Sequence, residues 1–163
     1  AATDAALGVC EIATDNAPGQ VVVSGDRARV EAVVDGAKAF GFKMAKTLAV
    51  SAPFHCSLMA PAALAMEKAL AETSMVAPRA PVVANITAQE VAAPADIRAM
   101  LVRQVTGRVR WTQSVAFMAD QGADSFVEVG SGKVLAGLIK RIARDVAVMS
   151  VGEPADIDAF MKF

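Results

Sequence analysis

Strand-like and helix-like spacings of apolar side chains alternate along the first 50 residues. Residues 8–15 (GVCEIATD) and the β-branched run at 20–24 (QVVVS) have the pattern of strands, and the turn-forming segment 16–19 (NAPG) separates them. Residues 27–40 place valines on one face at helical spacing before a glycine, which predicts a helix. Residues 42–50 predict a third strand. The order β-β-α-β lacks the first strand and helix of a ferredoxin-like β-α-β-β-α-β unit, so we expect that pair upstream of this chain.

Beyond residue 50 the pattern changes to longer helices that alternate with short apolar strands, and the segment Ser51–Pro53 marks the change. The predicted helices cover about 56–73, 95–104, 111–121, 132–143 and 154–163, and the predicted strands cover 82–86, 125–129 and 147–151. Alternating strands and helices favour a parallel sheet covered on both faces. Three strands are few for such a sheet, so this part is also expected to continue upstream. We therefore predict an α/β chain with an α+β small lobe, divided into residues 1–52 and 53–163.

Composition limits the function classes that the chain can serve. With 163 residues, of which 55% are hydrophobic and 20% charged, it is expected to bury a core as one domain or two small lobes. A formal net charge of −1 argues against nucleic acid as a partner. Two cysteines and one histidine are too few for a disulfide framework or a metal site. The sequence has no signal peptide and no apolar run long enough to span a membrane, so we expect a cytoplasmic location without membrane contact.

The single histidine, His55, lies in the segment SAPFHCSLM, where a predicted strand gives way to a helix at the junction of the two lobes. Small-molecule sites usually form in clefts between lobes. An imidazole there can act as a general base, because its unperturbed pKa lies near neutrality. A capping or half-buried structural histidine is the alternative, and position alone does not favour the catalytic role over it.

The sequence does not contain a complete nucleophile site. A nucleophile elbow needs G-x-S-x-G between a strand and a helix, and Ser131 lies in G-S-G instead. Ser57 is expected to begin a helix. Cys56 should point away from its neighbour His55 at a helix start, which favours an inert thiol.

The glycine-rich segment 127–135 (VEVGSGKVL) is similar to a phosphate-binding loop but lacks its key residues. A P-loop needs glycine where this chain has Val127, and serine or threonine where it has Val134. The glycines are instead expected to let the chain turn tightly from strand to helix. Two other polar candidates, Gln104 and Trp111, would be interpreted from the residues alone as a solvated helix end and a core side chain.

Five segments taken together, in this order and with this spacing, resemble the bacterial malonyl-CoA:acyl-carrier-protein transacylases. They are NAPGQVV with SG (16–22 and 24–25), SAPFHCSLM (51–59), PVVANI (81–86), LVRQ followed by VRW (101–104 and 109–111), and VEVGSGKVL (127–135). The resemblance covers nearly the whole chain.

The resemblance implies an incomplete fold. Members of this family have a large α/β-hydrolase-like lobe with a small ferredoxin-like lobe inserted into it. The chain would begin near the end of the small lobe's first helix, cross the small lobe and finish the large one. The N-terminal half, absent here, would hold the G-x-S-x-G serine, the arginine that binds the malonyl carboxylate, and part of the oxyanion hole. The resemblance thus implies that the isolated chain is inactive.

The resemblance also implies roles for five residues. His55 matches the catalytic histidine, which deprotonates the absent serine and returns the proton to the leaving thiol. Gln104 matches the residue whose main-chain carbonyl accepts the other imidazole N–H. Phe54 matches a position where an aromatic side chain goes with malonyl selection. Asn16 and Gln20 match the small-lobe turn at the mouth of the cleft and are expected to bind substrate.

The activity implied is transfer of a malonyl group from malonyl-CoA to the phosphopantetheine thiol of acyl carrier protein, in fatty-acid synthesis. The mechanism would be ping-pong acyl transfer through a serine ester, with no metal and no cofactor of the protein's own. The partners implied are malonyl-CoA, acyl carrier protein and the missing N-terminal half. Two alternatives stay open: an acyltransferase serving a polyketide synthase, and a non-catalytic binding module in which His55 is structural.

Overall fold

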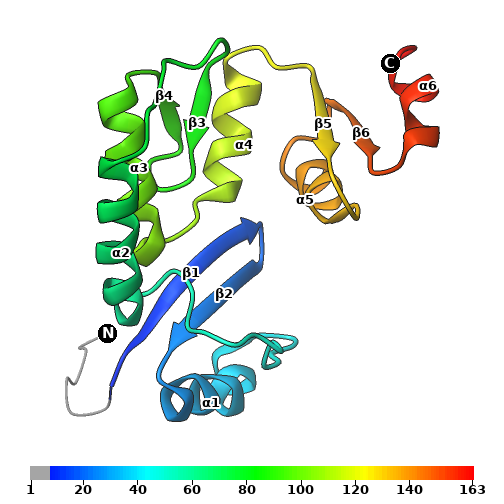
Figure 1. Cartoon of the computed structure of the whole chain (residues 1–163). Helices are drawn as coiled ribbons and strands as arrows, with labels where there is room; N and C mark the ends of the chain where they lie inside the picture. Colours follow the sequence, from blue (N-terminus) through cyan, green and yellow to red (C-terminus); the bar gives the residue numbers. More distant parts are fainter. Residues whose placement is uncertain (1–7) are drawn as a thin grey trace.

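The N-terminal part of the chain forms a β-hairpin followed by a helix in the computed structural model, which describes residues 8–163 (Figure 1). In chain order it consists of β1 (Cys10–Ala17), β2 (Gln20–Gly25), α1 (Arg27–Gly36) and the 3₁₀ helix η2 (Ala37–Phe40). The two strands pair antiparallel, and Gly19 closes the turn between them at φ +76°. Glycine adopts this left-handed conformation without a Cβ clash. The predicted hairpin and the helix after it are confirmed.

The predicted strand at 42–50 is wrong. The structure has no strand there, and every residue from 41 to 50 is exposed. The backbone hydrogen bonds in this segment are local, such as the one that Val50 N donates to Leu48 O at 3.0 Å. A strand needs a neighbouring strand to accept and donate its backbone hydrogen bonds. This segment has the residue types of a strand but no partner among the described residues.

The middle of the chain packs a small hairpin beside three helices (Figure 1). Its elements are η3 (Ser57–Met59), α2 (Ala60–Ala71), β3 (Val82–Ala84), β4 (Gln89–Val91), α3 (Pro94–Thr106) and α4 (Trp111–Asp120). Helices α2 and α3 lie side by side. The guanidinium of Arg98 on α3 donates to Leu70 O at 2.8 Å and to Thr73 O at 3.1 Å. These bonds link α3 to the C-terminal end of α2 and to the residues directly after it.

The strand predicted at 82–86 exists but does not join a parallel sheet, and this part of the prediction is wrong. β3 pairs with β4 in an antiparallel hairpin, with Ala84 opposite Gln89. A tight turn reverses the chain between them, and Ala88 in that turn has φ +56°. The partner strand β4 lies only a few residues away, so β3 meets it before any distant strand.

The C-terminal part forms the parallel βαβ unit that the alternation of strands and helices predicts. It consists of β5 (Ser125–Val129), α5 (Val134–Ile142), β6 (Ala147–Val151), the 3₁₀ helix η4 (Pro154–Asp156) and α6 (Ile157–Phe160). β5 and β6 pair parallel and in register over five residue pairs, from Ser125–Ala147 to Val129–Val151. The crossover helix α5 buries Ala136, Leu138 and Ile139. In the part of the chain that the structure describes, none of the helices has the length and hydropathy needed to span a membrane.

The glycine-rich loop between β5 and α5 is a tight turn, as predicted. Gly130 and Gly132 have φ of +135° and +92°. The carboxylate of Glu128 accepts hydrogen bonds from the backbone N–H groups of Leu135 at 3.1 Å and Ala136 at 2.8 Å. These N–H groups belong to the second and third residues of α5, in the first turn, where backbone N–H groups lack partners inside the helix. A carboxylate from the chain itself therefore occupies the place where a P-loop binds phosphate.

Glu128→Ala is expected to lower the free energy of unfolding by about 1 kcal/mol, because α5 loses its N-terminal cap. Thermal unfolding followed by circular dichroism checks this. Glu90→Ala, at an exposed carboxylate of β4, is the control that changes the charge equally. A Glu128→Ala protein as stable as the Glu90→Ala protein would contradict the capping role.

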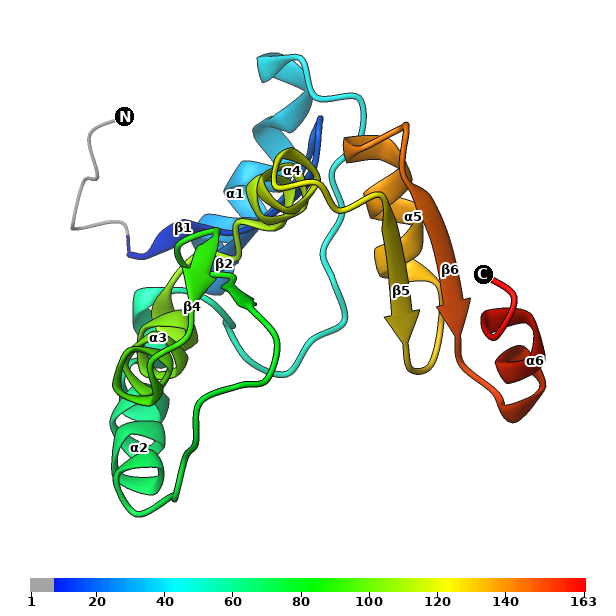
Figure 2. The same ribbon diagram turned by 90° about the horizontal axis from the view of Figure 1, so that it is seen from above.

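The N-terminal hairpin is joined to the rest of the chain by a short parallel contact between β1 and the segment that connects α3 and α4. Thr14 bridges Val109, Asp15 N donates to Val109 O at 2.9 Å, and Val109 N donates to Ala13 O at 2.9 Å. The Thr112 hydroxyl adds a bond to the Asp15 carboxylate at 3.0 Å. Figure 2, seen from above, shows β1 running close to α3 and α4. The division at residues 52 and 53 stays a prediction.

Candidate functional site

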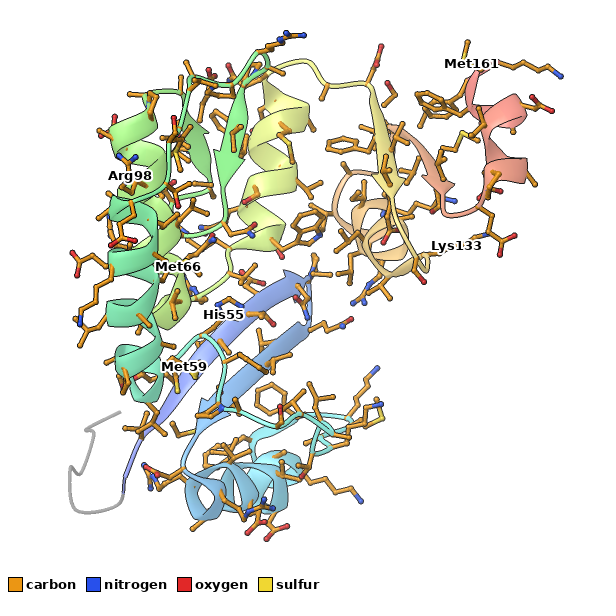
Figure 3. The ribbon with its side chains drawn as sticks, viewed as in Figure 1. His55, Met59, Met66, Arg98, Lys133 and Met161 are labelled. Atoms are coloured by element: carbon orange, nitrogen blue, oxygen red, sulfur yellow. The ribbon has the colours of Figure 1, made fainter. Side chains whose placement is uncertain are left out.

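His55 lies on the loop that leads into η3 and α2, and its backbone conformation is unusual. Its φ is +59°, in the left-handed region that side chains with a Cβ rarely adopt. Such a conformation costs on the order of 1–3 kcal/mol and persists only where surrounding contacts enforce it. The imidazole is half-buried. Figure 3 shows His55 beside β1, next to the start of α2.

The imidazole is hydrogen-bonded to the main chain of α3. His55 Nδ1 lies 2.9 Å from the carbonyl oxygen of Gln104. A carbonyl oxygen can only accept, so Nδ1 carries the proton in this bond. In the neutral imidazole the other nitrogen, Nε2, then has a free lone pair and can take up a proton. Within residues 8–163, no serine or cysteine side chain donates a hydrogen bond to His55.

The two residues after His55 hold the loop through hydrogen bonds to two different parts of the chain. Cys56 is fully buried, and its Sγ donates to the Pro53 carbonyl at 3.1 Å. Ser57 is bound to Glu11 of β1: its backbone N donates to Glu11 Oε2 at 3.0 Å, and its hydroxyl donates to Glu11 Oε1 at 2.6 Å. Ser57 begins η3, as predicted. Glu11 was not predicted as part of the site, because 46 positions separate it from Ser57 and no local pattern links them.

The residues expected to bind substrate lie on two different elements. Phe54, directly before the histidine, is about half exposed. Asn16 lies near the end of β1 and is half-buried, whereas Gln20 is exposed at the start of β2. The Gln20 side-chain oxygen accepts a hydrogen bond from Arg141 of α5.

The structure thus brings His55 and Gln104 into hydrogen-bond contact. Within residues 8–163, no hydrogen bond joins Asn16 or Gln20 to His55. Arg141 also donates to Pro18 O at 3.0 Å, so it fastens the tip of the hairpin to α5. The roles of all five residues in catalysis or substrate binding stay predictions.

The second cysteine near the site, Cys10, precedes Glu11 on β1. Burial raises the pKa of the Cys10 thiol, and the opposing effect of Arg29 is smaller. The thiol is therefore neutral at pH 7, and a neutral thiol is a poor nucleophile. Cys10 is therefore not a candidate nucleophile at neutral pH.

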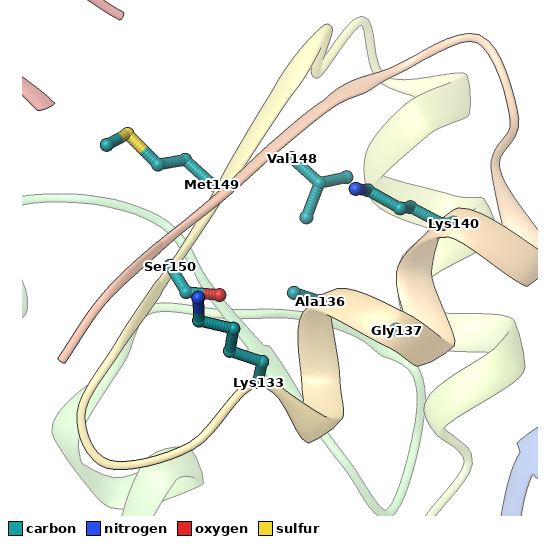
Figure 4. Close-up of a pocket in the computed structure, with 7 residues that line it drawn as sticks. All are labelled: Lys133, Ala136, Gly137, Lys140, Val148, Met149 and Ser150. Atoms are coloured by element: carbon teal, nitrogen blue, oxygen red, sulfur yellow. The ribbon is translucent and has the colours of Figure 1, made fainter. Parts of the chain in front are cut away.

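A groove of about 460 Å³ lies elsewhere, between α5 and β6 (Figure 4). Its lining residues are Lys133, Ala136, Gly137, Lys140, Val148, Met149 and Ser150. None of them is a residue that the sequence predicts for the site, so this groove is separate from the histidine.

Comparisons with known proteins agree on one enzyme. No family model matches the chain. The malonyl CoA-acyl carrier protein transacylase of Salmonella typhimurium is 46% identical over 122 residues, which are 75% of this chain and 40% of that protein. The acyl-carrier-protein S-malonyltransferase of Burkholderia pseudomallei is 44% identical with a TM-score of 0.93, and the match covers 98% of this chain and 52% of that one.

A second similar structure is a malonyl-transacylase solved in complex with a type II PKS acyl-carrier protein. It is 38% identical with a TM-score of 0.92, covering 95% of this chain and 50% of that one. The chain therefore spans about two fifths to a half of the length of the proteins it matches. Their likeness in fold confirms the predicted fold class.

Proposed function

Because the chain belongs to the family of malonyl-CoA:acyl-carrier-protein transacylases and spans about half of their length, we propose that it supplies the histidine half of an acyl-transfer site. The complete enzyme would move a malonyl group from malonyl-CoA to the phosphopantetheine thiol of acyl carrier protein, in the cytoplasm and without a cofactor of its own. The observation that carries the proposal is the hydrogen bond between His55 Nδ1 and the Gln104 carbonyl.

This bond suits a general base. With Nδ1–H held by Gln104, His55 Nε2 is the nitrogen that accepts the proton of the serine as its oxygen attacks the malonyl thioester. The same proton then goes to the leaving CoA thiol. In the second half-reaction Nε2 takes the proton of the phosphopantetheine thiol as its sulfur attacks the serine ester. The ester C–O bond breaks, the malonyl group stays on the sulfur, and Nε2 returns the proton to the leaving serine oxygen. A main-chain carbonyl has no formal charge, so it orients the imidazole while stabilising the imidazolium less than a carboxylate would.

A further segment is proposed to complete the site and cover this chain. Large apolar side chains are exposed along the segment after α1, including Phe40 at 83% and Met44 at 77% of their surface. Val129 and Val134, which flank the glycine-rich loop, are 80% and 71% exposed. Exposed apolar side chains in such number favour coverage by another part of the protein. The half that the relatives have and this chain does not match is the proposed cover and the proposed source of the serine.

The position of Phe54 supports selection of malonyl over branched acyl groups. A bulky ring directly before the histidine leaves less room for an α-methyl group. One methyl group in a pocket changes binding by only about 1–3 kcal/mol, so Phe54 alone would select partially. The similarity to a transacylase bound to a type II PKS carrier protein keeps service to a polyketide synthase as the second candidate.

The test is a hybrid enzyme, in which this chain is joined to the part of the Burkholderia pseudomallei relative that it does not match. We expect the hybrid to transfer malonyl groups to holo acyl carrier protein and the 163-residue chain alone to give no detectable transfer, since the serine comes from the other half. The relative, cut and rejoined at the same place, controls for the junction. Malonyl-enzyme formation on the chain alone, or a folded hybrid without transfer, would refute the proposal.

A further inference from the structure

The left-handed backbone conformation at His55 persists only if the residues before and after it are fixed. The residues after it are fixed by a contact from strand β1. Cys56, which precedes η3, makes no side-chain cap bond to the start of that helix. The backbone N–H of Ser57, at the first position of η3, donates instead to the carboxylate of Glu11. A carboxylate is well placed at a helix start, because the N–H groups there carry partial positive charge.

Glu11 contacts Ser57 with both of its oxygens. One accepts from the backbone N–H at 3.0 Å, and the other accepts from the hydroxyl at 2.6 Å. Two bonds to one residue fix its position and its orientation, and bonds to a carboxylate are stronger than neutral ones. Glu11 belongs to β1, where it pairs with Ser24 of β2, and β1 is bound further along to Val109. The carboxylate is therefore presented from a well-anchored strand.

We propose that Glu11 is a positioning residue for His55. It fixes the backbone two residues after the histidine, while the Gln104 carbonyl fixes Nδ1 of the ring. Because the backbone after His55 and the ring nitrogen Nδ1 are both fixed, the lone pair of Nε2 points in a single direction. Proton transfer requires that this direction be toward the serine hydroxyl. The proposal deepens the proposed function and rests on His55 being the general base. Misplacement of a reacting group by about 1 Å can reduce a rate 100-fold, so this contact can matter without touching substrate.

Three variants of the hybrid enzyme separate positioning from charge. Glu11→Ala removes both contacts. Glu11→Gln can keep both, because its oxygen accepts from Ser57 N and its amide donates to the Ser57 hydroxyl. Glu31→Ala removes the same charge from an exposed position on α1, where the carboxylate pairs with Arg27 at 3.8 Å. We expect Glu11→Ala to lower kcat about tenfold with KM within about twofold, whereas Glu11→Gln and Glu31→Ala stay near the parent.

The imidazole itself gives a readout that is independent of turnover. In ¹⁵N-histidine-labelled hybrid, the His55 signals are those missing from the His55→Gln protein. With the imidazole neutral, the parent and Glu11→Gln proteins should show the tautomer protonated at Nδ1. Glu11→Ala should show a mixture of both tautomers, because the ring no longer stays aligned with the Gln104 carbonyl.

The outcomes are distinct. If Glu11→Ala matches Glu31→Ala in kcat and tautomer, or if Glu11→Gln is as impaired as Glu11→Ala, Glu11 does not position His55. If His55→Ala retains full activity, the proposed function fails instead. Should Glu11→Ala not fold, Glu11→Asp withdraws both carboxylate oxygens from Ser57 by one methylene group, and an unchanged kcat and tautomer in that variant would equally overturn the proposal.

Discussion

His55→Ala in the hybrid enzyme is expected to reduce kcat for malonyl transfer about 10⁴-fold or more, because the serine loses the base that takes its proton. Steady-state transfer to holo acyl carrier protein measures the loss. Trapping of the malonyl ester should fall in parallel, since the proposed role of the histidine includes both half-reactions. Transfer at the parent rate would mean that His55 is structural, which is the alternative that its position in the sequence leaves open.

Gln104→Ala tests how the histidine is oriented. The contact to His55 Nδ1 comes from the main-chain oxygen of Gln104, which alanine also provides. The expected loss in kcat is therefore less than about tenfold, far smaller than that of His55→Ala. A loss of comparable size would show that the glutamine side chain, and not the backbone, has the essential role.

Gly25→Ala is expected to lower the free energy of unfolding by about 4 kcal/mol or more. A Cβ at Gly25 would lie 2.1 Å from the carbonyl oxygen of Val9 and 2.7 Å from its carbonyl carbon. The chain cannot move away easily, because Val9 and Asp26 exchange two hydrogen bonds there: Val9 N donates to the Asp26 carboxylate at 2.6 Å, and Asp26 N donates to Val9 O at 2.8 Å. The melting temperature should fall by roughly 10 °C.

Gly19→Ala is the matched control for this clash. Gly19 also has a positive φ, +76°, but a Cβ there would have no atom within 4 Å. The substitution should cost only about 1–2 kcal/mol, from the backbone conformation alone. Thermal unfolding of both variants checks the difference. Equal losses would mean that the junction of β2 and α1 relaxes around a methyl group, contrary to the close approach of Val9.

Helices and strands whose own residues favour that structure were predictable from the sequence. Strands that form only by pairing with a neighbouring strand were not. The β5 and β6 strands have the predicted bounds, because each is a short apolar run closed by turn residues. β4 was missed, since its sequence Gln-Glu-Val has no strand signature and becomes a strand by pairing with β3. The segment 42–50 was predicted wrongly for the converse reason: strand-forming residues without a partner stay extended loop.

The candidate site also contains residues that the sequence predicted and one that it did not. His55 could be found as the single histidine at a break in the pattern, and the family resemblance pointed to Gln104. Glu11 had no signal in the sequence, because a glutamate in a predicted strand is an ordinary exposed residue. Its contact with Ser57 exists only in the folded chain, where the hairpin lies against the loop.

Several contacts described above join residues that are far apart in the sequence, so during synthesis on the ribosome they can form only in a fixed order. The acceptor for the His55 imidazole follows 49 residues later, and the contact between Gln20 and Arg141 closes over 121 residues. At translation rates of roughly 5–20 residues per second, several seconds pass between synthesis of His55 and of its acceptor. The hairpin can form during that interval, since its partners are adjacent in sequence. The imidazole of His55 gains its carbonyl acceptor only afterwards, so a nascent chain that stalls before α3 lacks the contact that orients this ring.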